Sequence, residues 1–193
     1  MSVTKHQMKR SNHRDFIIES LGCRIQSYYP TASVQIGTGN TDASIVVVQS
    51  HTKMPERDAI TGALKNFGML NDAYRATSMI VELDPELNEH NLNRYYLKEL
   101  LEIIRPLMVV TCGPEATAIL RERKIRSFTS HTGKKFQVED LTDPVFYATL
   151  NPVDYGFARA SRALKEQGKA EWTKLASIYN KLKEKQEKER WAC

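Results

Sequence analysis

The sequence has 193 residues, 41% of them hydrophobic and 26% charged. This composition is typical of one globular domain that is long enough to bury a core. Nothing in it approaches the ~18 consecutive apolar residues of a membrane span, so we expect no membrane partner. The first residues lack the apolar core of a secretory signal. The three cysteines lie far apart, which argues against a disulfide scaffold or a zinc site and favours an intracellular protein, cytoplasmic or nuclear.

The charge balance is positive, with 28 Lys and Arg residues against 23 Asp and Glu residues. The formal net charge of +5 favours a polyanionic partner such as nucleic acid, although many basic proteins bind none. Residues 1–14 contain Lys, Arg and His but no acid, and we treat 1–22 as a basic N-terminal segment. It could lie along phosphates, be a solvated tail or be a mitochondrial presequence.

Four short runs that are rich in apolar and β-branched residues predict strands. Their nearly continuous apolar character predicts strands that are covered on both faces, as in a parallel sheet. The runs are residues 45–49, 79–83, 107–111 and 145–149.

The segments between these runs have the apolar spacing of amphipathic helices. They cover residues 57–67, 93–104, which Pro106 ends, and a helix that Gly113-Pro114 opens. Residues 168–193 predict a long last helix, of which the part up to Leu182 docks on the domain and the charged remainder is solvated. Because strands and helices alternate, we expect a three-layer α/β/α sandwich with a central four-stranded, mostly parallel sheet. The domain would span 23–165, followed by a C-terminal helical segment, 166–193.

Details of the loops carry a resemblance to a known family. Residues 37–48 contain Gly-x-Gly-Asn-x-x-Ala before an apolar strand, and 104–120 join a helix end, a Pro, a strand, a Gly and a helix of small residues. A glycine turn follows at 132–134, and 147–153 contain Asn-Pro. In this order and spacing, over about residues 23–160, the chain resembles the uracil-DNA glycosylase superfamily.

The resemblance implies a protein that handles DNA, because members of this superfamily flip a base out of the duplex into a pocket. It implies that the loop after the first strand positions a water and that the end of the second strand reads the base. It also implies that the last motif stabilises charge on the base carbonyl. The matching catalytic positions are Ser50, His51, Glu56 and Asn151, and the matching base-pocket positions are Gln49, Ser78 and Pro152.

The first loop departs from the family pattern Gly-Glu-Ala-Pro-Gly-x-x-Glu, of which only Glu56 remains. Ser50 stands where the water-positioning acid would be, and a Ser hydroxyl cannot act as a carboxylate base near neutral pH. Gln49 and Lys53 replace the glycines that let the backbone approach a ligand. These differences predict impaired glycosylase chemistry.

Ser78 offers a single hydroxyl where the family has a base-reading amide, so only Asn151-Pro152 keeps a form that some active branches use. Cys23 lies where one cluster cysteine of the family could fall, but it has no partner at a suitable spacing. We therefore expect no iron–sulfur cluster and no other cofactor. Cys112 is most simply a small buried residue.

Several polar side chains allow a functional and a structural interpretation. His51 could serve as a base or contact a phosphate, or it could simply be exposed. Glu56 and Asp58 could supply a carboxylate, although acids are favoured at a helix N-terminus without any ligand.

The basic side chains allow the same two interpretations. Lys134 and Lys135 follow the glycine turn and could clamp DNA phosphates, or they could be solvated. A cluster at a helix C-terminus could contact DNA, although cations are favoured there in any protein. The cluster comprises Arg121, Arg123, Lys124 and Arg126, and we count Arg123, Lys124 and Lys53 among the candidate DNA contacts. His131, before the turn, is open to both interpretations.

Two functional hypotheses follow. The favoured one is a catalytically degenerate DNA-binding protein on a glycosylase scaffold, used in DNA replication, repair or modified-base recognition, with a protein partner in such a complex. The alternative is an active monofunctional glycosylase that excises uracil or a modified pyrimidine with a shifted catalytic group. A third is a cleft that binds a nucleotide or another protein. Such divergence would suit a viral protein that acts in its host cell.

Overall fold

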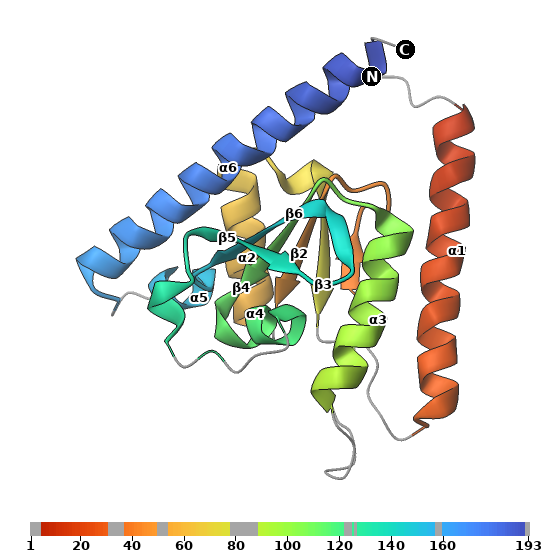
Figure 1. Cartoon of the computed structure of the whole chain (residues 1–193), viewed down its shortest axis with the longest axis horizontal. Helices are drawn as coiled ribbons and strands as arrows, with labels where there is room; N and C mark the ends of the chain where they lie inside the picture. Colours follow the sequence, from red (N-terminus) through yellow and green to blue (C-terminus); the bar gives the residue numbers. More distant parts are fainter. Residues whose placement is uncertain are drawn as a thin grey trace.

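The fold is an α/β/α sandwich, seen in a computed structural model that describes residues 5–30, 37–49, 54–77, 89–121, 125, 127–156 and 160–191 (Figure 1). Helices cover both faces of one central sheet. The predicted fold class is confirmed, but the sheet has six strands in place of the four that we predicted.

The sheet has the strand order β1-β3-β2-β4-β6-β5. Its four inner strands, β3, β2, β4 and β6, are parallel, whereas β1 and β5 pair antiparallel at the two edges. The two antiparallel edge strands account for the difference from the prediction. The strands are β1 (Gly37–Gly39), β2 (Ile45–Gln49), β3 (Ala73–Thr77), β4 (Met108–Cys112), β5 (Lys134–Val138) and β6 (Leu141–Thr149).

Alternate residues of the inner strands supply two separate cores, because successive side chains in a strand point to opposite faces. In β2, Val46 and Val48 pack with α1, α3 and α4, whereas Ile45 and Val47 pack with α2 and α6. The helices are α1 (Lys5–Tyr28), α2 (Met54–Asn66), α3 (Glu89–Ile104), α4 (Gly113–Arg121), α5 (Pro152–Gly156) and α6 (Arg162–Trp191), with short 3-10 turns at η1 (Leu70–Asp72) and η2 (Phe128–Ser130).

Three of the four predicted strands are confirmed as β2, β4 and the second half of β6. The predicted run 79–83 lies outside the described residues. The strand that pairs with the other side of β2 is β3, which we did not predict. The predicted helices correspond to α2, α3, α4 and α6.

The N-terminal basic segment is helical from Lys5 onward, which the sequence analysis did not predict. The C-terminal half of α1 packs on α3 through Ile18, Leu21 and Ile25, and Arg14 forms an ion pair with Asp42 at 2.8 Å. The boundary that we placed after residue 22 therefore falls within a helix.

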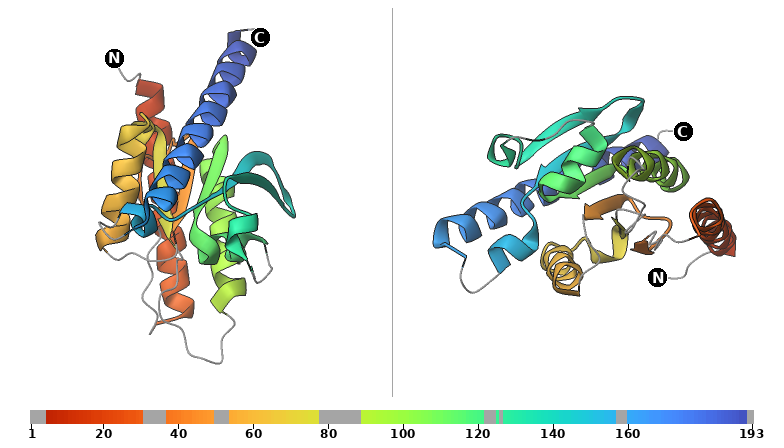
Figure 2. Two further views of the ribbon diagram at one scale, coloured as in Figure 1. Left: turned by 90° about the vertical axis from the view of Figure 1, so that its left-hand side faces the viewer. Right: turned by 90° about the horizontal axis from the view of Figure 1, so that it is seen from below.

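The last helix, α6, crosses one face of the sheet and continues beyond it (Figure 2). Trp172, Leu175 and Tyr179 are fully buried against the sheet, which confirms that this part of the helix docks. At the far end Trp191 is 90% exposed. Of the helices in the described ranges, none combines the length and the apolar character needed to cross a membrane.

Candidate functional site

The carboxyl ends of the four parallel strands meet along one edge of the sheet, which we call the carboxyl edge. The strand register places Gln49 of β2 beside Thr77 of β3, and Cys112 of β4 beside Thr149 of β6. The chain runs from β2 to β3 on one side and then returns past β2 to β4 on the other. Open α/β sheets bind ligands at such a reversal, outside the carboxyl ends of the strands. The topology therefore points to the crevice between β2 and β4.

Asn151 lies at this edge, two residues beyond the end of β6, and its amide has a defined orientation. Its Oδ1 accepts a hydrogen bond from the backbone N–H of Val153 at 3.1 Å. Its backbone carbonyl accepts one from the N–H of Asp154 at 2.9 Å. Asn151 thus caps α5, in the way that Asn favours at a helix start. Pro152, the buried first residue of α5, suits the first helical turn because it needs no N–H partner there.

The turn after β4 brings Gly113 next to Asn151. A side chain at Gly113 would place its Cβ 3.6 Å from the Cβ of Asn151 and 4.0 Å from its Nδ2. Gly113 also has a φ of 88°, which glycine adopts without strain. Thr117 of α4 secures this turn by donating its hydroxyl to the Gly113 carbonyl at 2.8 Å. The amide of Asn151 therefore lies where β4 and β6 both end.

The helix α2 packs against α5, so α2 lies beside the short helix that Asn151 and Pro152 begin. Gln49, the last residue of β2, is only 2% exposed. Of the positions that the family resemblance implied, the structure thus places Gln49, Asn151 and Pro152 at the carboxyl edge.

The remaining predicted catalytic and base-pocket positions cannot be placed. Ser50, His51 and Ser78 lie outside the described residues. Glu56 belongs to α2, but its side chain lies outside the described part of the chain.

A buried acid at this edge, Glu171 of α6, was missed by the sequence analysis. It is 7% exposed, and four side-chain or backbone groups donate hydrogen bonds to its carboxylate. The donors are the hydroxyls of Thr132 (2.7 Å) and Thr149 (3.1 Å), the N–H of Leu150 (2.9 Å) and the amide of Gln167 (2.9 Å). The sequence held a signal for it, because Glu171 interrupts the apolar helical stripe formed by Trp172, Leu175 and Tyr179.

Two tyrosines lie beneath this edge, in an environment that disfavours charge. Burial raises the pKa of Tyr147 to about 12, with a smaller contribution from Glu171. Burial also raises the pKa of Tyr155, which Cys112 and Glu171 increase further. Cys112 itself is fully buried, in agreement with the expectation that it is a packing residue. The two tyrosines are therefore neutral near pH 7.

The lysines at the amino end of β5 share this edge, because β5 is antiparallel to β6. Lys134 stands in register with Ala148, and its Nζ donates to the Ser130 carbonyl at 2.9 Å. Lys174 of α6 donates to the neighbouring Gly133 carbonyl at 3.0 Å. Lys135 is exposed on the next position of β5.

The predicted basic cluster after α4 is only partly placed. Arg121 donates a hydrogen bond to the Nδ1 of His131 at 2.8 Å and lies over the ring of Phe136. Because a guanidinium can only donate, this Nδ1 is an acceptor and a neutral His131 carries its proton on Nε2. Arg123, Lys124 and Arg126 lie outside the described residues, as does Lys53.

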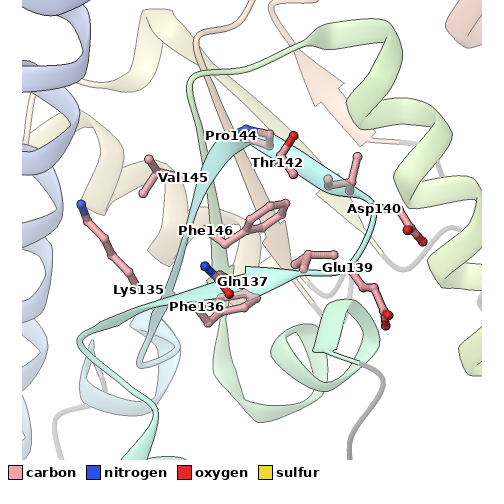
Figure 3. A pocket seen from close by; sticks show the side chains of 11 residues that line it. Lys135, Phe136, Gln137, Glu139, Asp140, Thr142, Pro144, Val145 and Phe146 are labelled. Atoms are coloured by element: carbon pink, nitrogen blue, oxygen red, sulfur yellow. The ribbon is translucent and has the colours of Figure 1, made fainter.

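Two of the hollows that described residues line do not include Gln49, Asn151 or Pro152 in their lining. One, of about 870 Å³, is formed by the β5–β6 hairpin, where the rings of Phe136 and Phe146 lie 5.6 Å apart (Figure 3). The other, of about 570 Å³, lies at the opposite edge of the sheet and is lined by Arg14 of α1 and Arg190 of α6. Neither contains a residue that the family resemblance implied to be catalytic.

Comparisons with known proteins add no assignment. No protein-family model matches the chain, and a search of curated proteins finds no match.

Proposed function

We propose that this chain is a DNA-binding protein on a uracil-DNA glycosylase-like scaffold that has lost the ability to excise bases. The proposal depends chiefly on one observation: the oriented amide of Asn151 and the two cations Lys134 and Lys174 occupy the same edge of the sheet. An oriented amide can contact a base edge, and lysines at its rim can contact the phosphates on either side.

The charge of α6 supports a polyanionic partner. From Arg162 to Lys181 this helix carries five cations and two acids. One acid, Glu171, is buried, and the other, Glu166, pairs with Arg162 at 2.8 Å. The cations are Arg162, Lys165, Lys169, Lys174 and Lys181. Because Lys and Arg release condensed counterions from DNA, such a surface favours nucleic acid without reading its sequence.

The loss of glycosylase chemistry is supported by the acids near the edge. In the sequence, Ser50 takes the place of the acid that positions water in the family. Among the described residues, Glu171 directs its carboxylate at four hydrogen-bond donors. A carboxylate held in this way directs its oxygens at protein donors and stabilises the fold, so it is poorly placed to orient a water molecule.

One observation favours the alternative, an active glycosylase. Asp154 is an exposed residue in the first turn of α5, three residues beyond Asn151, and the partial loss of water around its carboxyl group raises its pKa above the ordinary value. A carboxyl group with a raised pKa beside a fixed amide is a candidate general acid or base.

A single experiment separates the two functions. Uracil-containing single-stranded and duplex oligonucleotides would be incubated with the protein and treated with alkali, and parallel samples would be run on native gels at two salt concentrations. We expect no strand breaks, and a shift in mobility that weakens at high salt. Breaks that disappear in Asn151→Ala would instead establish the glycosylase, and the absence of any shift would refute DNA binding.

The two lysines are tested by a matched pair of variants. Lys134→Gln combined with Lys174→Gln should weaken binding and lower the slope of log K against log salt by about one for each phosphate that is no longer neutralised. Lys185→Gln combined with Lys188→Gln, which removes the same number of charges from the exposed part of α6 beyond the sheet, should leave both quantities unchanged. Equal effects in both proteins would mean that general charge, and not the carboxyl edge, binds the DNA.

A further inference from the structure

We propose that Glu171 is a positioning residue that holds the two sides of the DNA-binding edge, the segment of Asn151 and the turn before Lys134, in one arrangement. This inference rests on the proposed function. It concerns a residue that the family resemblance did not implicate.

On one side, Glu171 fastens the end of β6. Its Oε2 accepts the Thr149 hydroxyl at 3.1 Å and the Leu150 N–H at 2.9 Å. Leu150 is 8% exposed, so its N–H would have little access to water if this bond were absent. Because Asn151 follows directly, its backbone starts from a peptide that the carboxylate holds.

On the other side, Glu171 fastens the turn before β5. The same Oε2 accepts the Thr132 hydroxyl at 2.7 Å. Gly133 packs directly on this acid, since a Cβ added there would lie 3.3 Å from the Cγ of Glu171. Lys174, one helical turn further along α6, holds the Gly133 carbonyl at 3.0 Å. Glu171 and Lys174 of α6 therefore hold the turn from which β5 begins at Lys134.

The site needs an acceptor oxygen at the Leu150 N–H, and the neighbours of its other oxygen can adapt. A carboxylate accepts through both oxygens and donates nothing, and all four neighbouring groups donate to it. A glutamine can keep its carbonyl at the Leu150 N–H if Gln167 turns its own amide to accept from the new NH₂. An alanine leaves the buried Leu150 N–H without an acceptor.

The test compares Glu171→Ala and Glu171→Gln with a control that is destabilised elsewhere. Leu100→Ala serves as that control, because Leu100 is fully buried on α3, against the opposite face of the sheet. Affinity for single-stranded and duplex oligonucleotides would be measured well below the melting temperature of every variant. The side-chain amide NMR signals of Asn151, identified by their loss in Asn151→Ala, would be recorded without DNA.

We expect Glu171→Ala to weaken DNA binding about tenfold and to shift the Asn151 amide signals, because the polar groups of the edge would no longer be held in their orientation. In Glu171→Gln, the DNA affinity and the Asn151 amide signals should both stay near the wild-type values. Leu100→Ala should melt at a lower temperature, but its DNA affinity and its Asn151 amide signals should match those of the wild type. This combination would show that Glu171 positions the edge. Both alanine variants are destabilised, so destabilisation alone would not explain a loss of affinity and a signal shift that occur only in Glu171→Ala.

Other results would overturn the inference. If Glu171→Ala and Leu100→Ala bind DNA equally well at matched distance from their melting temperatures, Glu171 only stabilises the fold. If the wild type binds no DNA, the proposed function fails, and the Asn151 signals alone then decide whether Glu171 positions this edge. Unchanged signals in Glu171→Ala would refute positioning in either situation.

Discussion

Gly168 of α6 lies directly against the ring of Tyr155 in α5, and replacing it with Ala should destabilise the protein. Gly168 is buried in the interior of α6, where Ala normally raises helix stability by about 1 kcal/mol relative to Gly. A Cβ at this position would lie 2.5 Å from Cδ1 and 2.6 Å from Cε1 of the Tyr155 ring. The ring would therefore have to move by about 1 Å to reach ordinary van der Waals contact.

The size of the effect follows from two opposing contributions. Overpacking of this kind costs about 1–3 kcal/mol and helix propensity returns about 1 kcal/mol, which leaves a net loss centred on about 1 kcal/mol. Gly62→Ala provides the matched control, because Gly62 is also within a helix, α2, and a Cβ there would meet nothing within 4 Å. Gly62→Ala should stabilise the protein by about 0.5–1 kcal/mol.

The assay is urea unfolding followed by circular dichroism. The free energy of unfolding of Gly168→Ala should be about 2 kcal/mol lower than that of Gly62→Ala. This difference corresponds to ~4–8 °C in melting temperature for a domain of this size. Adding Tyr155→Ala should remove most of the penalty of Gly168→Ala, measured against Tyr155→Ala alone. If both glycine replacements stabilise the protein alike, the close packing of α5 on α6 is refuted.

Two further predictions concern other contacts. Burial raises the pKa of Tyr74 and Tyr147 from 10.0 to about 12, so folding favours the neutral phenols. The stability that each phenol contributes is fully present below pH 10 and is lost between pH 10 and 12, and it amounts to about 2–3 kcal/mol. Tyr147→Phe should therefore flatten the plot of unfolding free energy against pH in that range. An unchanged plot would contradict the burial argument. Asp72 accepts from Tyr179 at 3.0 Å and Lys183 at 2.8 Å, so Asp72→Ala should cost about 1–3 kcal/mol in thermal unfolding, more than Asp42→Ala at an exposed ion pair.

The inner strands could largely be predicted because their side chains are apolar on both faces. β2, with the sequence Ile-Val-Val-Val-Gln, has all five residues buried, and β4 is the same. β3 could not be predicted in this way, because Ala73-Tyr74-Arg75-Ala76-Thr77 has a charge and only one β-branched residue. It is a strand because it pairs with β2 on one side and β1 on the other, and both partners are separated from it in sequence by α2.

The candidate site was predictable only in part. Asn151 and Pro152 stand in a short motif, and the structure gives the motif a local reason, since one caps α5 and the other begins it. The place of Glu171 on the apolar stripe of α6 indicates burial, but its hydrogen-bond partners lie 21 to 39 residues away in sequence, and no local pattern identifies them. The helix α1 was missed because its N-terminal charge obscured the apolar spacing of Ile18, Leu21 and Ile25.

The position of α6 in the sequence determines the order in which the two cores can close during translation. The core that contains Val46 and Val48 is built from α1, α3 and α4, all of which leave the ribosome before β6 does. The core on the other face requires Trp172, Leu175 and Tyr179, which follow every strand. A nascent chain that ends at β6 therefore presents one covered face and one that only α2 covers, and the uncovered apolar part of that second face is where a chaperone would act.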